Sequence, residues 1–311
     1  MGKTALLFAG QGAQTVGMGR DLADKFPTAK TLFDRANAVL GYDLARICFD
    51  GPEPELTKTE NAQPAIFLVG WIAFDLLRER IPGLEFHATA GLSLGEFTAL
   101  AAANSMSFED SLRVVRERGR FMQEAAEASR GGMAAIIGLD ESATREVCAQ
   151  TGVYLANLNC PGQIVISGSS DKMQQACELA KARGAKRALP LSVNGAYHSP
   201  LMASAQPKLQ AALDAVTLRE PILPVISNVT ARPHGSATEI RQRLVDQVTA
   251  SVRWEDSMRY LLSQGVTRFV ELGPGTALTG FMKRIDKNAQ ILNIADLPSL
   301  DATAKALTSA A

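Results

Sequence analysis

The order of apolar and helical segments constrains the fold of this chain more than any other feature of its sequence. Four short apolar segments are typical of β-strands: residues 4–9, 87–92, 224–229 and 267–272. The longer segments between them have the pattern of helices. Strands that alternate with helices predict a mostly parallel sheet with helices on both faces.

The middle of the chain departs from this alternation. Between residues 130 and 194 the expected order of elements is β-α-β-β-α-β, which is the ferredoxin-like arrangement. We therefore predict an α/β fold with two domains. A discontinuous large domain, residues 1–129 and 195–311, holds the parallel sheet, and residues 130–194 form an inserted ferredoxin-like α+β small domain.

The charge balance narrows the classes of partner. Lysine plus arginine and aspartate plus glutamate both number 32, so the formal net charge is zero. Nucleic-acid binders usually carry a basic surplus, so we expect no nucleic-acid partner. An acidic protein can still bind a local basic patch. Since no apolar run approaches ~18 residues, we also expect no membrane-spanning helix.

The cysteines and histidines do not have the spacing of a metal site. No two cysteines form C-x-x-C, and the histidines are far apart in the sequence: Cys48, Cys148, Cys160, Cys177, His87, His198 and His234. The first residues, MGKTALLFAG, are too short an apolar run for a secretory signal peptide. We therefore expect reduced, buried cysteines, a cytoplasmic protein and no bound metal.

The segment GLSLGEF, residues 91–97, has the G-x-S-x-G pattern around Ser93. An expected strand precedes it and an Ala-rich helix follows, as in the turn that exposes a nucleophilic serine. Such a serine needs a base for its proton and an oxyanion hole, to which the N–H of Leu94 can contribute. Alternatively, Gly91 and Gly95 only permit a tight turn.

A histidine is the usual base for such a serine. His87 lies in the strand that leads to the serine, and His234, in ARPHGS, is expected in an exposed loop. His198, in NGAYHSP, follows the last strand of the small domain, where the chain returns to the large domain. A cleft between two domains suits a catalytic base, but a structural role for His198 is equally open.

Further motifs follow one another in a specific order. They are GQGAQ at 10–14, GLSLGEF at 91–97, RGRFMQ at 118–123, NCPGQIVISG, GAYH at 195–198, Gln247 seven residues before Trp254, and ELGPG. With them the chain resembles the malonyl-CoA:acyl-carrier-protein transacylase family from about residue 3 to 295. The resemblance implies an α/β-hydrolase-like large domain with a ferredoxin-like insert. It also implies malonyl transfer in fatty-acid or polyketide synthesis, without a cofactor other than the substrate malonyl-CoA.

The resemblance implies roles for the reacting groups as well. Ser93 would accept malonyl from malonyl-CoA and pass it to the phosphopantetheine thiol of acyl carrier protein. His198 would be the base and then the acid, and an acceptor of Gln247 would orient its other ring nitrogen, in place of the aspartate of a triad. The backbone N–H groups of Gln11 and Leu94 would form the oxyanion hole.

Arg118 would hold the free carboxylate of the malonyl group in a bidentate pair. Its local sequence allows a plainer interpretation, because RVVRERGR contains four arginines and such a run is usually a solvated helix face. The resemblance selects Arg118 and leaves Arg113, Arg116 and Arg120 on the surface.

Two positions are expected to affect acyl selectivity. Tyr197 stands where malonyl-selective relatives usually have Phe and methylmalonyl-selective relatives have Ser, and its large ring leaves little room for an α-methyl branch. Leu92 stands where relatives usually have His before the nucleophile. We expect its side chain to flank the acyl pocket without a role in the chemistry.

Two other functions stay open from the sequence. A serine esterase or thioesterase would share the nucleophile, but the H-G-G-G loop is absent and no clear Asp lies between Ser93 and His198. A non-catalytic module that docks on a carrier protein would fit Leu92, but not the intact Ser93, His198 and Arg118. For the transferase we expect malonyl-CoA and a transient acyl carrier protein as partners. We also expect a monomer, since transfer within one cleft needs no dimer.

Overall fold

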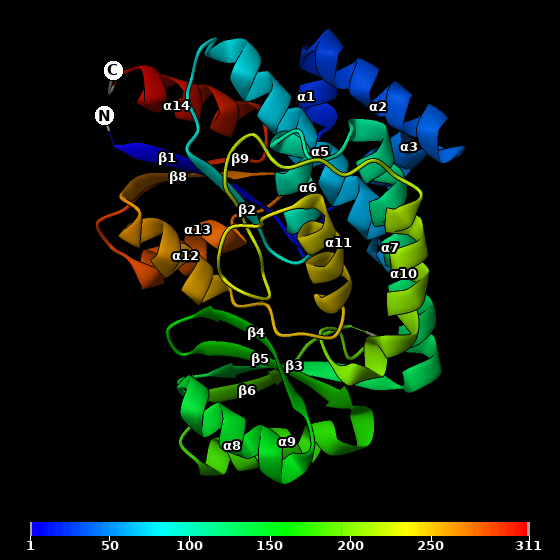
Figure 1. The fold of residues 1–311 in the computed structure, drawn as a ribbon, viewed down its shortest axis with the longest axis vertical. Coiled ribbons are helices and arrows are strands. Elements are labelled where there is room, and N and C mark those ends of the chain that lie inside the picture. The colour runs from blue at the N-terminus through cyan, green and yellow to red at the C-terminus, as the bar shows by residue number, and fades with distance from the viewer. Residues whose placement is uncertain (1, 194, 310–311) are drawn as a thin grey trace.

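The computed structural model describes residues 2–193 and 195–309, which are organised around two sheets (Figure 1). A five-stranded sheet has the order β7-β2-β1-β8-β9, and every neighbouring pair in it is parallel. A four-stranded antiparallel sheet has the order β4-β5-β3-β6. The predicted α/β class, with a parallel sheet and an inserted α+β unit, is confirmed.

The large sheet takes its strands from both ends of the chain. They are β1 (Lys3–Phe8), β2 (Ala88–Gly91), β7 (Val225–Ile226), β8 (Val266–Leu272) and β9 (Gln290–Ile294). The helices before the insert are α1 (Arg20–Lys25), α2 (Pro27–Leu40), α3 (Leu44–Asp50), α4 (Glu53–Thr57), α5 (Thr59–Arg80), α6 (Leu94–Ala102) and α7 (Phe108–Ser129). Those after it are η1 (Pro200–Ala205), α10 (Gln206–Asp214), α11 (Ala237–Asp246), α12 (Trp254–Ser263), α13 (Ala277–Ile285) and α14 (Leu297–Thr308).

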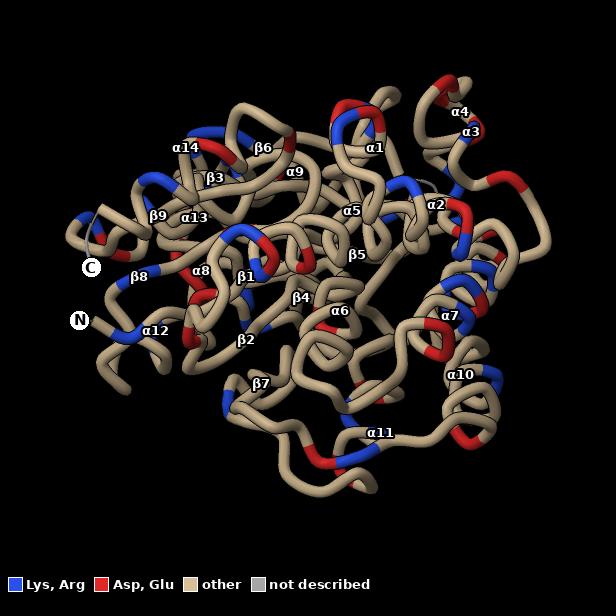
Figure 2. Tube along the Cα trace, turned by 90° about the horizontal axis from the view of Figure 1, so that it is seen from above, with Lys and Arg blue, Asp and Glu red and all other residues tan. Residues whose placement is uncertain are grey.

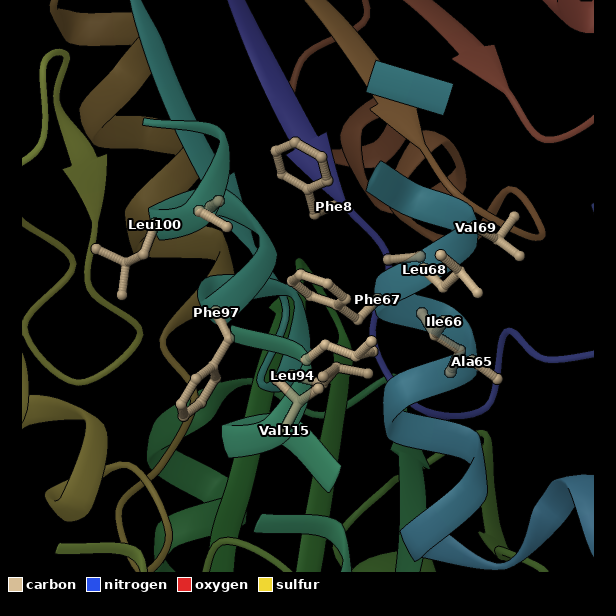
Figure 3. Packing of buried hydrophobic residues seen from close by; sticks show 14 of the residues in the cluster. Phe8, Ala65, Ile66, Phe67, Leu68, Val69, Leu94, Phe97, Leu100 and Val115 are labelled. Carbon is tan, nitrogen blue, oxygen red and sulfur yellow. The ribbon is translucent and has the colours of Figure 1, made fainter. Parts of the chain in front are cut away.

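Alternate residues of β1 face two separate cores, as the two-residue period of a strand requires. Leu6 and Phe8 belong to the larger core, which α5, α6 and α7 cover, whereas Ala5 and Leu7 pack with α12 and α13. Figure 3 shows Phe67 of α5 pointing toward α6, below Phe8. The sheet is therefore buried on both faces, which explains why its strands are apolar runs without alternation.

The small sheet is built from one continuous segment of chain. Its elements are β3 (Gly131–Ile137), α8 (Glu141–Thr151), β4 (Tyr154–Cys160), β5 (Gln163–Ser169), α9 (Ser170–Ala182) and β6 (Arg187–Pro190). Their order is the predicted β-α-β-β-α-β, and α8 and α9 lie together on one face, at the bottom of Figure 1. The boundaries at residues 130 and 194 stay a prediction, and Asn194 lies outside the described residues.

The two units are joined by backbone hydrogen bonds between β4 and the segment that follows α11. The N–H of Leu158 in β4 donates to the carbonyl of Val252 (2.9 Å), and the N–H of Val252 donates to the carbonyl of Ala156 (2.8 Å). Val252 thus adds a short parallel bridge to the free edge of β4. This clasp ties β4 to the five-residue stretch that begins after Gln247.

The expected strand 224–229 is shorter than predicted. Only Val225 and Ile226 pair with β2, and the chain then leaves the sheet so that Asn228 turns toward Ser93. Because the strands are parallel, their carboxyl ends meet at one edge, where Gln11, Ser93 and Asn228 follow β1, β2 and β7. The functional residues gather at this edge.

Candidate active site

Ser93 lies in a strained turn between β2 and α6. Its backbone has φ 52° and ψ −103°, a conformation that L-residues rarely adopt. A Cβ at Gly91 would come within 1.9 Å of the backbone of Gly95, and one at Gly95 would come within 2.2 Å of the carbonyl oxygen of Phe8. Both glycines are therefore required by close backbone packing, and the turn they allow is that of a nucleophilic serine.

His198 lies beside the serine hydroxyl. Its Nε2 is 2.9 Å from Ser93 Oγ, and its Nδ1 is 2.9 Å from the backbone carbonyl oxygen of Gln247. A carbonyl can only accept, so Nδ1 carries the proton and Nε2 is free to receive one from the serine. The acceptor expected from Gln247 is thus its main chain and not its side chain. His198 also has a positive φ of 59°, a second strained backbone at this site.

The surroundings of His198 keep its ring neutral. Burial, and next the charge of Arg118, lower the pKa of His198 from its usual value to about 4. The side chain is buried, and the Gln247 carbonyl only partly offsets these two effects. At neutral pH the ring is therefore neutral, and its free Nε2 is a base in contact with Ser93.

Arg118 is fully enclosed behind the serine. It is 1% exposed and donates to Gln63 Oε1 (2.7 Å), Ser93 Oγ (3.0 Å) and Gln247 Oε1 (2.8 Å). Its guanidinium also lies 5.2 Å from the ring centroid of Phe97, which Figure 3 shows on α6. Its Nε finds no acceptor among the described residues. Burial lowers the pKa of Arg118 to about 10, so the group stays cationic at neutral pH.

The other three arginines of the run have ordinary surface environments. Arg113, Arg116 and Arg120 have side-chain exposures of 55%, 34% and 39% and pair with nearby acids of α7. Figure 2 shows both charge signs side by side along this helix. Helical periodicity alone separates Arg118 from them, because it turns inward where they turn outward.

The side chain of Gln247 connects Arg118 to a group of buried acceptors. Its Oε1 accepts from Arg118, while its Nε2 donates to the Ser93 carbonyl (3.0 Å) and to Glu96 Oε2 (2.6 Å). Asn228 completes the group: its Oδ1 accepts from the N–H of Ser93 (2.6 Å), and its Nδ2 donates to the carbonyl of Gly91 (2.7 Å). These bonds hold the turn on both sides of the nucleophile.

His234 does not lie in an exposed loop, and that prediction is wrong. Its side chain is fully buried, and its Nε2 is 2.6 Å from Glu96 Oε1, whose side chain is equally buried. The polar sequence ARPHGS indicated solvent, but the loop folds back under α6. His87 accepts from the N–H of Thr4 at the start of β1, away from Ser93.

The two expected oxyanion donors flank the serine. Leu94 is the first residue of α6, and Gln11 follows β1 at the neighbouring strand end. Neither backbone N–H donates to an acceptor within the described part of the chain. A free N–H at a helix start is a suitable donor to a developing anion.

A cavity of about 420 Å³ opens in front of Ser93. Its lining includes Ser93, His198, Leu92 and Tyr197, whereas Arg118 is not among the described lining residues. Both units of the fold contribute to its wall, including Val165 of β5. Most of the wall is apolar.

The hydroxyl of Tyr197 does not point at the serine. It lies 2.8 Å from Thr59 Oγ1, which also accepts from the side chain of Gln11 (3.4 Å). Burial raises the pKa of this hydroxyl above its usual value. The ring thus stands as a fixed wall of the cavity, and the additional hydroxyl is used for anchoring.

Comparison with known proteins identifies the family. The model of the acyl transferase domain matches residues 5–304. A malonyl CoA-acyl carrier protein transacylase of Bacillus subtilis (strain 168) is 44% identical over 306 residues, covering 97% of this chain and 96% of the relative. The chain belongs to the acyl transferase family. The family inferred from the motifs is confirmed, and the protein is an acyltransferase.

Further relatives give the same result for this acyltransferase. The Escherichia coli (strain K12) protein of the same name is 42% identical over 289 residues, 92% of this chain and 93% of the relative. An acyl-carrier-protein-S-malonyltransferase structure from Bartonella henselae has a TM-score of 0.94 at 38% identity, covering 98% and 99% of the two chains. A malonyl-transacylase solved with a type II polyketide acyl-carrier protein has a TM-score of 0.95 at 38% identity, covering 98% and 99%.

Two other features of the acyltransferase concern metals and membranes. Among the residues that the structure describes, no three His, Cys, Asp or Glu side chains are grouped to hold a metal ion. Over the same residues, no helix is both long and apolar enough to cross a bilayer. The four cysteines are buried and free.

Glu96, Asn228 and His234 also belong to the site, although the sequence motifs did not indicate a role for them. The spacing of Glu96 is a usable signal, because a residue three positions after Ser93 in a helix lies on the same side of that helix. Asn228 lies near the end of the expected strand 224–229, and strand ends are where ligand-binding residues collect. His234 had no such signal, because a short polar loop is typical of exposed chain and only the tertiary fold buries it.

Proposed function

We propose that this chain transfers the malonyl group of malonyl-CoA to the phosphopantetheine thiol of an acyl carrier protein, through an ester on Ser93. The observation that carries the proposal is the position of one hydroxyl. Ser93 Oγ lies 2.9 Å from an unprotonated His198 Nε2 and 3.0 Å from Arg118, at the inner end of an apolar cavity. The product serves fatty-acid or polyketide synthesis.

In the first half-reaction Ser93 is acylated. His198 Nε2 takes the hydroxyl proton while Oγ attacks the thioester carbonyl carbon of malonyl-CoA. The N–H groups of Gln11 and Leu94 stabilise the oxyanion of the tetrahedral intermediate. The carbon–sulfur bond then breaks, and the proton on His198 leaves with the CoA thiolate as the free thiol.

The second half-reaction repeats these steps with another thiol. His198 takes the proton of the phosphopantetheine thiol, and the sulfur attacks the ester carbonyl on Ser93. When the ester bond breaks, the same proton returns to Ser93 Oγ, which restores the enzyme. The carbonyl of Gln247 accepts from Nδ1 throughout, so it stabilises the imidazolium that forms in each step.

Arg118 provides the selection for a dicarboxylic acyl group. A malonyl ester places its free carboxylate within a few bonds of Ser93 Oγ, where the guanidinium already lies. The unpaired Nε and the hydrogens now shared with Ser93 are available for a bidentate contact. Leu92 and Tyr197 limit the width of the cavity, so they affect which acyl groups fit.

The partners follow from the same proposal. Malonyl-CoA and an acyl carrier protein bind in turn, without a metal or other cofactor, and the chain acts as a monomer. A related transacylase solved with a carrier protein supports the second partner. A cytoplasmic location is part of the proposal and rests on the free, buried cysteines.

Intact mass spectrometry after mixing with malonyl-CoA tests the proposal. The wild-type chain should gain one malonyl group that disappears when holo acyl carrier protein is added and reappears on that protein. Ser93→Ala should gain no malonyl group and keep its fold. Free malonate in place of transfer would indicate an esterase, and a wild type without adduct would indicate a docking module.

A further inference from the structure

A buried acid–imidazole pair lies behind Ser93 and takes no part in the steps above. It consists of Glu96 on α6 and His234 in the loop after β7, both with fully buried side chains. A buried carboxylate is costly unless its lone pairs are satisfied. The stability of this pair therefore depends on what each oxygen of Glu96 binds.

Both oxygens of Glu96 are occupied by directed donors. Oε1 accepts from His234 Nε2 at 2.6 Å. Oε2 accepts from Gln247 Nε2 at 2.6 Å and from the N–H of Asn228 at 3.1 Å. His234 Nδ1 has no partner in the described ranges, and its Nε2–H is the donor to Glu96. Each oxygen of Glu96 therefore faces N–H donors only.

The side chain of Gln247 links the Glu96 carboxylate to the Arg118 guanidinium. Since its Nε2 must face Glu96, its Oε1 must face Arg118, and it does so at 2.8 Å. The charge of Glu96 raises the pKa of Arg118, against the larger effect of burial that lowers it. One buried anion is thus coupled to one buried cation through a single amide.

We propose that Glu96, held by His234, is a positioning residue that balances the charge of Arg118 and so sets how strongly the site attracts a malonyl carboxylate. The inference rests on the proposed function and deepens it. An unbalanced guanidinium would attract the carboxylate more strongly. It would also act more strongly on His198, whose base strength it already lowers, and so slow proton transfer.

Glu96→Gln tests this role, because it removes the charge and keeps the shape. Its amide oxygen can accept from Gln247 and Asn228, and its NH₂ can face His234 in the other ring tautomer. Single-turnover acylation, read by intact mass, gives a half-saturating acyl-CoA concentration and a rate at saturation. For malonyl-CoA we expect both to fall roughly tenfold. For acetyl-CoA only the rate should fall, so selectivity for malonyl rises.

Variants of His234 give a second, independent measurement. His234→Leu removes the donor that holds Glu96 Oε1 in place, so it should shift selectivity in the same direction as Glu96→Gln. His234→Gln places an amide N–H where Nε2 was and should stay closer to the wild type. Glu141→Gln, on the exposed surface of α8, is the matched control for loss of one negative charge.

The outcomes separate this inference from the proposed function. Equal losses with malonyl-CoA and acetyl-CoA in Glu96→Gln, or a higher half-saturating concentration of malonyl-CoA, would overturn the charge-balancing role and leave only support of the fold. A wild type that forms no malonyl ester would instead overturn the proposed function. Circular dichroism of each variant verifies that the chain compared is folded.

Discussion

The two sides of Ser93 differ in how they are built. The rear side, formed by Glu96, Asn228 and Gln247, is a set of buried polar groups joined by hydrogen bonds of 2.6–3.5 Å. The front side is the cavity of about 420 Å³, whose wall is mostly apolar. Directed bonds specify geometry, whereas an apolar wall specifies only space. The rear therefore fixes the orientation of the polar groups around Ser93, and the front limits the size of the acyl group that fits.

The difference has an energetic consequence. Removing one rear group leaves its buried partners without hydrogen bonds, which costs about 1–3 kcal/mol for a neutral group and more for a charged one. Replacing a front residue by another of similar volume usually costs less than about 1.5 kcal/mol. Substitutions that touch Ser93 from the rear should therefore have larger kinetic effects than those that line the cavity.

The largest effect is expected for His198→Ala, which removes the group that spans both sides. The loss of a general base slows acyl transfer on the order of 10²–10⁴-fold. Stopped assays of malonyl transfer to carrier protein would measure it. His87→Ala is the control, since His87 lies at the far end of the sheet. A comparable loss in His87→Ala with an active His198→Ala would contradict the assignment of the base.

Arg118→Ala should have the next largest effect, and only for a dicarboxylic substrate. Removing one partner of a buried charge pair costs roughly 2–5 kcal/mol, which should depress malonyl transfer. Acetyl transfer should be unchanged or faster, because acetyl has no carboxylate to pair. An assay in which malonyl-CoA and acetyl-CoA compete gives the ratio of malonyl to acetyl transfer directly. Arg120→Ala, on the exposed face of the same helix, should leave that ratio as it is.

The pH dependence of kcat/KM, which reports on His198 between the two sides, should show a smaller effect than these substitutions. Because the pKa of His198 is lowered to about 4, its base form persists as pH falls, and kcat/KM should stay flat from pH 7 to about 5. The unfolded ring protonates first, near its ordinary value of about 6.5. His198 therefore stabilises the fold above that pH, and the contribution is lost as pH falls toward 4. An acid limb near 6.5 in kcat/KM would rule out this environment.

Leu92→His is expected to have the smallest effect, because position 92 lies on the front wall. The variant should keep transferase activity and change the kinetic constants only moderately. Acyl-CoA panels with the wild type and the variant would measure any change in selectivity. If the variant were active and the native chain were not, the native residues would not form a complete active site.

Parts of the fold could be predicted from the sequence because they depend on local patterns. The apolar strands, the inserted segment and the glycine-bounded turn at Ser93 each have a period or a spacing that limits the backbone locally. The two glycines are an example, since no other residue fits the close contacts at Gly91 and Gly95. The end of β7 was not predictable, because its last residues are drawn out of the sheet by Asn228.

The rear side could not be predicted in the same way. Gln247 was expected as an acceptor, but which of its atoms faces His198 depends on the hydrogen bonds that its amide makes to Arg118, Ser93 and Glu96. The burial of His234 depends on a loop that returns beneath α6, a contact between residues 138 positions apart. Such long-range contacts produce no periodic pattern in the sequence, so they can be identified only in the folded structure.

The clasp between β4 and Val252 bears on how such enzymes can be recombined. In a chimaera that exchanged only residues 131–190, the two backbone bonds to Val252 would depend on a foreign strand. Those bonds fix the stretch that directly follows the carbonyl partner of His198. The insert and the stretch from 247 to 253 should therefore be exchanged together. A crossover that separates them would change the turnover rate as well as the shape of the pocket.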